Sequence, residues 1–527
     1  MSKSLNLAKV STKSGFNLFW GQAVSSIISA VGVMIIAGIL EEGEYGLMGI
    51  ALTAPSLIQI IRDLGVDQAT IKYTAQYNQW AKSSKIKNVL TAAITFEFLF
   101  GIILSILSYV ISGYVATQIF DRPQLISIIQ IASFTIFGNA LITISNSAFI
   151  GYEKMQYRSI LIVIQSLFKS ILMIILVLSN FGVHGAILGQ TIGCLITGFV
   201  GITILYFRFY KKIHTKTDKH EIIPTLKQML KFGLPLSGAR IMNGFKIQVF
   251  GFLIAIYLSD QIVGNYNLAT NFSLLVAFFV TPIQILLFPA FSKIDKKSDP
   301  KILQNVFRYS IKYASLFVVP ATFMVMALSQ PAVGTLFPGK YELTPLYLSL
   351  NVILYLYTAF GYLSSGNLIK SQGRTDINLK LGFLSTILGI ILSLILIPIF
   401  GVIGLMLTIL IAILPATIIS LWWIKKHHHA TIDFKSSVKI LTASSISAVL
   451  TYSLVFVLNS SNWITLTIGA IVFLASYIVI APLIRAINKD DVKNLKEMFQ
   501  TLGRLAIIID IPLNIIEKIA TKRQPNK

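Results

Sequence analysis

The sequence predicts an all-α integral membrane protein with about 14 transmembrane helices. Charged residues make up only 12% of the 527 residues, against about 25% in soluble chains. Apolar stretches long enough to cross about 30 Å of hydrocarbon recur along nearly the whole length. Lys and Arg collect in alternate loops between these stretches, which is typical of a multi-pass topology.

Each apolar stretch predicts one helix, because about 20 residues are needed to cross the bilayer. The first stretch is long and lacks a small-residue cleavage site, so it predicts a first span and not a signal peptide. Together the stretches fill the chain and leave no room for a soluble catalytic domain. The expected helices are 15–40, 45–64, 87–112, 123–150, 156–179, 183–208, 229–258, 262–290, 305–329, 343–369, 377–399, 401–424, 437–459 and 462–486.

The loop charges predict the orientation. With the N-terminus inside, the outer loops hold only Arg122 and Lys340, and one outer loop is acidic, with Glu41, Glu42 and Glu44. The other Lys and Arg residues of the loops fall inside, so both termini are expected in the cytoplasm. The protein itself is expected in the plasma membrane. The net charge of +23 is thereby explained without nucleic acid, because it is spread over many short loops.

An internal repeat relates the two halves of the chain. The segment 180–189 (NFGVHGAILG) matches 399–408 (IFGVIGLMLT) at an offset of 219. Independently, Leu40, Gly46 and Ala51 match Leu258, Gly264 and Ala269 at an offset of 218. Six helices lie within one period, so the two halves should share one orientation, related by a pseudo-two-fold axis along the membrane normal.

The repeat predicts two pseudo-symmetric six-helix lobes with two added helices. In the tail, basic residues such as Lys489 and Lys493 alternate with apolar residues such as Leu495 at helical spacing. This pattern predicts an amphipathic helix. The expected parts are an N-terminal lobe at 1–210, a cytoplasmic inter-lobe loop at 211–228, a C-terminal lobe at 229–427, transmembrane helices 13 and 14 at 428–487, and a cytoplasmic amphipathic tail at 488–527.

Charges inside the apolar stretches point to a function, because each costs about 2.5–3.5 kcal/mol at mid-bilayer. Lys169 lies near the centre of the fifth helix, and Arg62 ends the second. Arg240 and Lys246 lie on one face of the seventh. These cations predict a cavity for an anionic substrate such as a phosphate or diphosphate head group or an acidic sugar. The alternative for each cation is a purely structural role, in which it pairs with a backbone carbonyl or an acid.

Other polar residues complete the candidate site. Glu97, inside the third helix, is a candidate partner of a cation or an ion-coupling group. Amides and aromatic rings can recognise sugars, although they serve equally well in helix–helix contacts. The candidates for a polar lining are Asn17, Trp20, Gln22, Asn139, Asn243 and Asn267.

No pattern of catalytic, metal-binding or nucleotide-binding residues appears. Cys194 is the single cysteine, which excludes a disulfide or a cysteine-based metal site within the chain. The run from His427 to His429 beside Lys425 favours a solvated basic loop over a metal site. We therefore expect a transporter that has no cofactor and is driven by an ion gradient, the membrane potential or a substrate gradient.

Several short motifs occur in a characteristic order. They are SGFNLFWGQAVSSIISAVGVMIIAGIL followed by EEGEYGLMGIAL, DLG at 63–65, FGLP at 232–235, VGNYNLA at 263–269, and FGVxG after the fifth and eleventh helices. By these motifs and their spacing, nearly the whole chain resembles the polysaccharide transporter branch of the multidrug/oligosaccharidyl-lipid/polysaccharide exporter superfamily. The expected number of fourteen helices is also similar to that of this branch, whereas drug-exporting relatives usually have twelve.

The resemblance implies a flippase for a polyprenyl-phosphate- or diphosphate-linked oligosaccharide. It implies two lobes in a V around a hydrated cationic cavity, contact with membrane lipids, and glycosyltransferases or a polymerase as pathway partners. One departure concerns the seventh helix, where members often carry an acid. This chain has Gln248, Val249 and Phe250 in that window, so that acid's ion-coupling role is not expected here.

Three other functions compete with the flippase. A drug or cation antiporter of the same superfamily would favour acids in the cavity, which the internal Lys and Arg residues do not. A membrane glycan polymerase or ligase would need catalytic groups on sizeable outer loops, and the outer loops here are short. A scaffold without transport is the third, and the repeat argues for a transporter instead.

Overall fold

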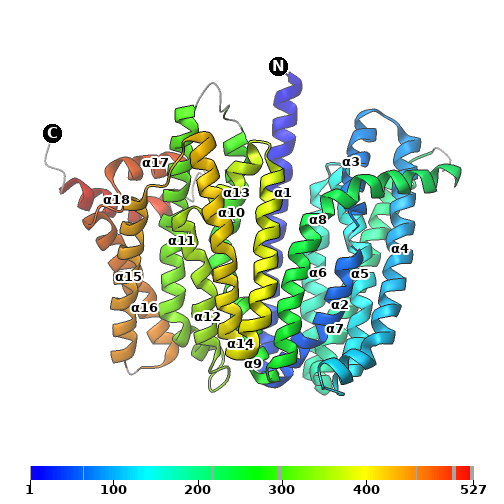
Figure 1. The fold of residues 1–527 in the computed structure, drawn as a ribbon, viewed down its shortest axis with the longest axis horizontal. Coiled ribbons are helices and arrows are strands. Elements are labelled where there is room, and N and C mark those ends of the chain that lie inside the picture. Colours follow the sequence, from blue (N-terminus) through cyan, green and yellow to red (C-terminus); the bar gives the residue numbers. More distant parts are fainter. Residues whose placement is uncertain are drawn as a thin grey trace. The chain divides into compact units, whose positions relative to one another are not determined.

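The computed structural model describes residues 2–62, 64–214, 219–292, 294, 300–458, 460–500 and 506–522. Within these ranges the secondary structure is helical, without a β-strand (Figure 1). The chain divides into two compact units, Met1–Asn267 with Ser393–Gly401, and Leu268–Leu392 with Val402–Lys527. The all-α membrane fold predicted from the sequence is confirmed, and each unit is described separately below.

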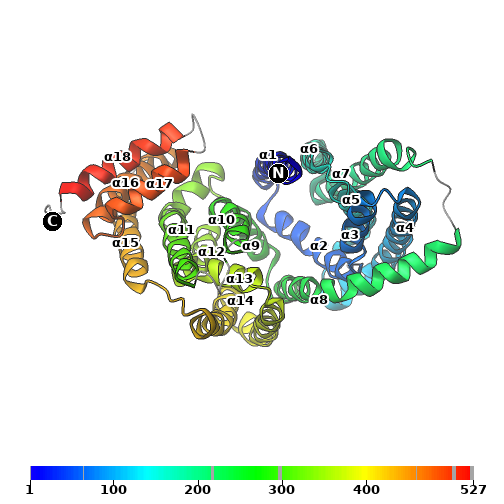
Figure 2. The ribbon, with the colours of Figure 1, turned by 90° about the horizontal axis from the view of Figure 1, so that it is seen from above.

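The first unit is a bundle built around α5 (Leu125–Gly151). α5 packs against α4 (Ser83–Tyr114) and α7 (Gly182–Leu205), and α6 (Met155–Leu176) packs against α7 and α1 (Ser2–Ile39). Figure 2 shows these helices end-on. Glycines allow the close approach: a Cβ on Gly198 would lie 2.9 Å from the Gly138 carbonyl oxygen. The unit also contains α2 (Glu42–Arg62), α3 (Val66–Gln79), α8 (Lys219–Tyr257), the first part of α9 (Asp260–Phe272), the segment Ser393–Gly401, and the π-helices η1 (Val115–Ile119), η2 (Val177–Phe181) and η3 (Tyr206–Tyr210).

The second unit has α11 (Pro300–Leu336) at its centre, packed against α15 (Phe434–Val457) and α16 (Asn462–Leu483). Leu316, Val319, Ile440 and Phe473 form part of its apolar core. The other elements are α10 (Leu274–Ser292), α12 (Thr344–Val352), the 3₁₀ helix η4 (Ile353–Phe360), α13 (Tyr362–Ser371), α14 (Thr375–His428), α17 (Lys489–Gln500) and α18 (Ala506–Lys522).

The helices are long and apolar enough for the expected topology. Among the described residues, ten helices could cross a membrane by length and composition, or up to twelve when two bent pairs are each counted as one span. Two of these candidates, of 56 and 54 residues, are far longer than the roughly 20 residues that one crossing needs. Each contains a break in its middle, so the helices are consistent with the 14 crossings predicted from the sequence.

The two breaks share one backbone conformation. Gly182, the first residue of α7, has φ 51° and ψ −135°, and Gly401, inside α14, has φ 59° and ψ −131°. Side chains with a Cβ avoid this region, so only glycine fits well. The two residues are 219 positions apart, which is the offset of the sequence repeat, and their common geometry supports the repeat.

Three elements differ from the sequence expectation. The expected loop after the second helix contains α3, whose buried Val66, Ala69, Thr70 and Tyr73 recur at helical spacing. The expected eighth helix is divided into α9 and α10, and the expected tenth is bent by 55° at Gly361. The apolar stretches run through these breaks unchanged, so hydropathy alone does not locate them.

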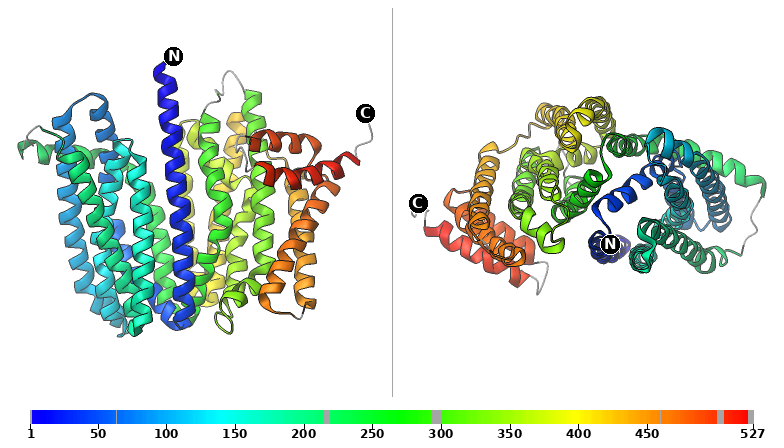
Figure 3. Two further views of the ribbon diagram at one scale, coloured as in Figure 1. Left: turned by 180° about the vertical axis from the view of Figure 1, so that it is seen from behind. Right: turned by 90° about the horizontal axis from the view of Figure 1, so that it is seen from below.

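The tail contains α17 and α18, visible beside α16 in Figure 3. Val492 and Leu495 of α17 are buried in the same apolar core as Leu316 and Phe473. Lys312 of α11 donates to the Asp491 carboxylate at 2.6 Å, and both side chains are buried. The apolar face of α17 therefore packs on helices of its own unit.

Candidate functional site

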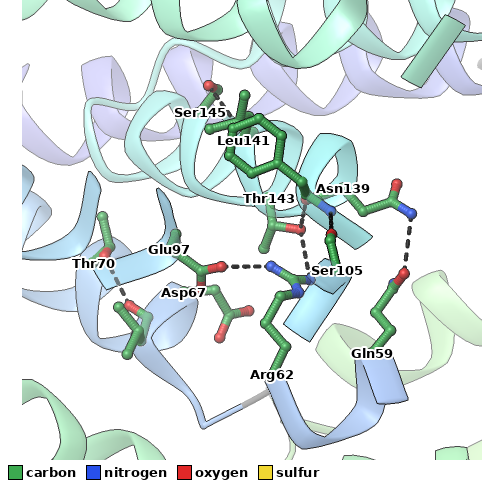
Figure 4. Close-up of polar contacts among 12 residues, drawn as sticks. Gln59, Arg62, Asp67, Thr70, Glu97, Ser105, Asn139, Leu141, Thr143 and Ser145 are labelled. Atoms are coloured by element: carbon green, nitrogen blue, oxygen red, sulfur yellow. Dashed lines mark hydrogen bonds and ion pairs between the residues drawn. The ribbon is translucent and has the colours of Figure 1, made fainter. Parts of the chain in front are cut away.

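A polar cavity of about 330 Å³ lies inside the first unit, among α2, α3, α4, α5 and α8. Four of its lining residues are ionisable and come from four different helices, so the bundle brings together charges that are distant in sequence. Part of it is drawn in Figure 4. The polar lining residues are Ser56, Gln59, Arg62, Asp67, Glu97, Thr143, Arg240 and Gln248.

Arg62 and Glu97 form a buried ion pair in this cavity. The Arg62 Nη1 donates to Glu97 Oε2 at 2.6 Å, and Nη2 donates to the Thr143 hydroxyl at 3.2 Å (Figure 4). The two side chains are 7% and 4% exposed. The Nε of Arg62 is buried and has no acceptor among the described residues. Arg62 thus points into the bundle and does not extend to the membrane surface.

A tight turn after α2 positions Arg62. Gly65 has φ 77°, in the left-handed region, and directly precedes Val66, the first residue of α3. A Cβ on Gly65 would lie 2.3 Å from the carbonyl oxygen of Gly233. Two of the motifs noted in the sequence, DLG and FGLP, therefore meet backbone to backbone at the edge of the cavity; Asp63 of the first lies outside the described residues.

Asp67 and Arg240 form the second ion pair. Nη1 and Nη2 of Arg240 donate to the two carboxylate oxygens of Asp67 at 3.0 and 3.1 Å. Burial by itself raises the pKa of Asp67, but the hydrogen bonds from Arg240 and Gln68 outweigh it and hold the pKa below its ordinary value. The Arg240 side chain is 44% exposed, so solvent screens this pair more than the first.

Asp67 was not among the residues predicted from the sequence. It lies in the segment that was expected to be a loop, where a single charge suggests solvent exposure. The available signal was its position two residues after the DLG motif, in the first turn of a short helix with apolar residues at helical spacing.

The two lysines predicted for a cationic cavity do not line this one. Lys169 lies where α6 crosses α7, and a Cβ on Gly193 would lie 2.8 Å from its Cα. Lys246 lies on α8, one turn beyond the exposed Asn243. Within the described part of the chain, neither ammonium group has a hydrogen bond or an ion pair. The structure thus brings together Arg62, Arg240 and Glu97 from the predicted set.

The polar uncharged candidates have different surroundings. The amide of Asn139 donates to Gln59 at 3.1 Å and so supports a residue of the cavity wall. The Asn267 amide packs against α2, where a Cβ on Gly49 would lie 1.9 Å from its Nδ2. Trp20 and Gln22 are exposed on α1, and the side chain of Asn17 lies outside the described residues.

The histidine run packs against an aromatic residue. His427 stacks on Trp423 with ring centroids 4.4 Å apart, and its Nδ1 lies 3.0 Å from the Trp423 carbonyl oxygen. His428 is buried. No group of three or more His, Cys, Asp or Glu residues in the described ranges is arranged to hold a metal ion.

Comparison with known proteins identifies relatives over most of the chain. The family model described as polysaccharide biosynthesis protein matches residues 11–295. The putative O-antigen transporter of Shigella dysenteriae is 25% identical over 358 residues, 68% of this chain and 85% of the relative. The lipopolysaccharide biosynthesis protein WzxC of Escherichia coli (strain K12) is 23% identical over 383 residues, 70% of this chain and 72% of the relative.

The fold is also similar to that of solved transporters. The structure of the lipid II flippase MurJ in an inward closed conformation superposes with a TM-score of 0.69 at 16% sequence identity. The match covers 88% of this chain and 98% of the other. The similarity at this identity concerns the fold.

Proposed function

Because the chain belongs to the polysaccharide biosynthesis protein family, we propose that it moves a lipid-linked oligosaccharide from the inner to the outer leaflet of the plasma membrane. Its relatives carry names of transporters and of polysaccharide biosynthesis proteins, and its fold is that of a flippase. The protein is accordingly a membrane transporter and not an enzyme.

The observation that carries the proposal is a polar cavity inside an apolar helix bundle. A glycan cannot cross about 30 Å of hydrocarbon unless its hydroxyl groups stay hydrogen-bonded. The cavity offers charged and amide groups from α2, α3, α4 and α8 within the helix bundle of the first unit. Arg62 and Glu97 are buried there at a cost that a merely structural bundle would not need.

The proposal includes an orientation and a set of partners. The Lys and Arg bias of the loops supports two cytoplasmic termini. The cavity then lies toward the cytoplasmic side, near the turn between α2 and α3, where a newly made lipid-linked glycan arrives. Glycosyltransferases that build the glycan and a polymerase that consumes it are the proposed partners. Lobes at 1–210 and 229–427 are proposed to alternate the access.

The diphosphate of the carrier needs positive charge. Lys169 and Lys246 supply it in this proposal, because both lie within spanning helices and neither has an acidic partner among the described residues. A cation antiporter is less well supported, since Glu97 and Asp67 each already pair with an arginine. Glu97 remains the proposed site of any ion coupling.

A reconstituted flipping assay tests the function. Proteoliposomes carry a polyprenyl-diphosphate oligosaccharide, and a sugar-binding probe added outside reports its leaflet. We expect protein-dependent movement that falls at least severalfold in Lys169→Ala and Lys246→Ala. Lys370→Ala, an exposed lysine at the end of α13, serves as the control and should move lipid like the wild type.

Two outcomes would contradict the proposal. Absence of movement by the wild type, with a sodium gradient and a proton gradient each imposed, would reject the flippase, and efflux of a cationic dye from the same vesicles would identify an antiporter. Normal movement by both lysine variants at equal protein levels would reject their assignment to the diphosphate.

A further inference from the structure

The described residues that line the cavity in the first unit carry no net charge. They include two guanidinium groups and two carboxylates, and each guanidinium pairs with one carboxylate: Arg62 with Glu97, and Arg240 with Asp67. A diphosphate placed there would meet cations whose charge is already balanced and two carboxylates that repel it. The cavity is therefore poorly suited to the anionic part of a lipid-linked glycan.

Building on the proposed function, we infer that this cavity binds hydroxyl groups of the glycan, and that the diphosphate of the carrier is bound elsewhere. Paired charges and side-chain amides suit a sugar, because each hydroxyl both donates and accepts a hydrogen bond. Carboxylates accept from a sugar, guanidinium groups donate to it, and the amides of Gln59 and Gln248 do both. The hydroxyls of Ser56 and Thr143 extend the same lining.

One buried atom indicates where the ligand is held. The Nε of Arg62 has no acceptor among the described residues, although the side chain is only 7% exposed and both its other nitrogens are hydrogen-bonded. A buried donor without an acceptor costs about 1–3 kcal/mol. Because Arg62 lines the cavity, a small rotation of its side chain on binding would bring this buried donor to a sugar oxygen.

The size of the cavity limits what it binds. Its volume of about 330 Å³ is at the lower end of the range of about 300–1,000 Å³ for small-molecule sites. It accommodates a short part of a glycan and not a long chain. The cavity should therefore select only the sugars that enter it, and the rest of the glycan can vary.

A competition experiment tests the division between glycan and diphosphate. Flipping by wild-type proteoliposomes is measured with either of two soluble inhibitors: oligosaccharide released by mild acid from the cells' lipid-linked pool, or inorganic diphosphate. Arg62→Lys retains the charge opposite Glu97 and removes the Nε donor. We expect it to raise the half-inhibiting concentration of the oligosaccharide about tenfold, the effect of one lost hydrogen bond, and to leave inhibition by diphosphate unchanged.

The matched variant is Lys246→Ala, which should weaken inhibition by diphosphate and leave inhibition by the oligosaccharide unchanged. Gln248→Leu, which lines the cavity outside both ion pairs, replaces Arg62→Lys if that variant does not fold. The inference is overturned if the cavity variants weaken inhibition by diphosphate instead, or if the free oligosaccharide does not inhibit a wild type that flips lipid.

Failure of the proposed function gives a different result. A wild type that moves no lipid would reject the flippase, and oligosaccharide binding would then be measured calorimetrically on the purified protein in detergent. Binding that weakens in Arg62→Lys would support the sugar site without flipping, whereas absence of binding would reject the sugar site as well.

Discussion

Gly46 of α2 and Gly264 of α9 pack against each other through their backbones. A Cβ on Gly46 would lie 1.8 Å from the carbonyl oxygen of Asp260, and a Cβ on Gly264 would lie 2.0 Å from that of Glu42. Each glycine is four residues after the first residue of its helix, and the two are 218 positions apart. Positions equivalent in the repeat therefore touch each other reciprocally.

Substitution of either glycine by alanine should destabilise the protein. The atoms that a new methyl group would meet belong to the backbone of the other helix, so they cannot rotate away. We expect Gly46→Ala and Gly264→Ala to lower the midpoint of thermal unfolding in detergent by several degrees. Gly113→Ala is the control, since its methyl group would meet nothing within 4 Å; equal midpoints for all three variants would contradict the close contact.

Much of this fold follows from the sequence, because helices that cross a membrane must be long and apolar. The division at Ser273 and the bend at Gly361 do not follow, since the apolar stretch continues through both. The offset of 218 aligns Gly46 with Gly264 but does not indicate that they touch. A repeat identifies equivalent positions, and only packing determines which of them are neighbours.

The candidate site was predictable in part for a similar reason. Arg62, Glu97 and Arg240 are identified by the cost of burying charge in apolar helices. Asp67 lies outside such a stretch, so the same argument does not reach it. Which acid pairs with which base depends on the crossing of α2, α3, α4 and α8, and that information is in the packing.

Removal of Arg62 alone should be more damaging than removal of the whole ion pair. Arg62→Met leaves the Glu97 carboxylate buried without its partner, which costs about 3–5 kcal/mol. The double variant with Glu97→Met replaces both charges by apolar groups and should recover most of the thermal stability. Flipping should stay impaired in the double variant; recovery of both properties would show that the pair serves folding only.

The Asp67–Arg240 pair should be insensitive to pH in the physiological range. The pKa of Asp67 lies below its ordinary value, so its stabilising contribution is present above the unfolded-state pKa of about 3.9 and is lost only as the pH falls through the lower folded-state value. The difference in unfolding midpoint between wild type and Asp67→Asn should therefore be constant from pH 5 to 8. Below about pH 4, the unfolded-state pKa, the difference should shrink; a difference that stays constant there as well would mean that the pKa of Asp67 is not lowered.

Gly182 and Gly401 should respond alike to substitution. Both have the same positive φ and negative ψ, a conformation that costs a residue with a Cβ about 1–3 kcal/mol. Alanine at either position should lower the unfolding midpoint by a similar amount. Gly382→Ala, in the same helix as Gly401 but without any neighbour within 4 Å, should leave the midpoint unchanged or raise it slightly.

The tail should be released by loss of one carboxylate. Asp491 accepts from the buried Lys312 at 2.6 Å and from the backbone N–H of Asn488 at 2.8 Å. Asp491→Ala leaves both donors without an acceptor, so α17 should detach and limited proteolysis should cut the chain between α16 and α17. Asp490→Ala removes an adjacent, exposed acid and should leave the cleavage rate unchanged; equal rates for both variants would contradict the docking.

A reciprocal contact such as that between Gly46 and Gly264 has the form of an isologous interface, in which two copies of one chain pair about a two-fold axis. In a homodimer every substitution appears on both sides. Here one chain encodes both sides, and they have diverged: Asp260 accepts from Arg122 at 2.5 Å, whereas Glu42 accepts from the amides of Gln261 and Asn265. Covalent fusion thus allows each side of a symmetric joint to be adjusted separately.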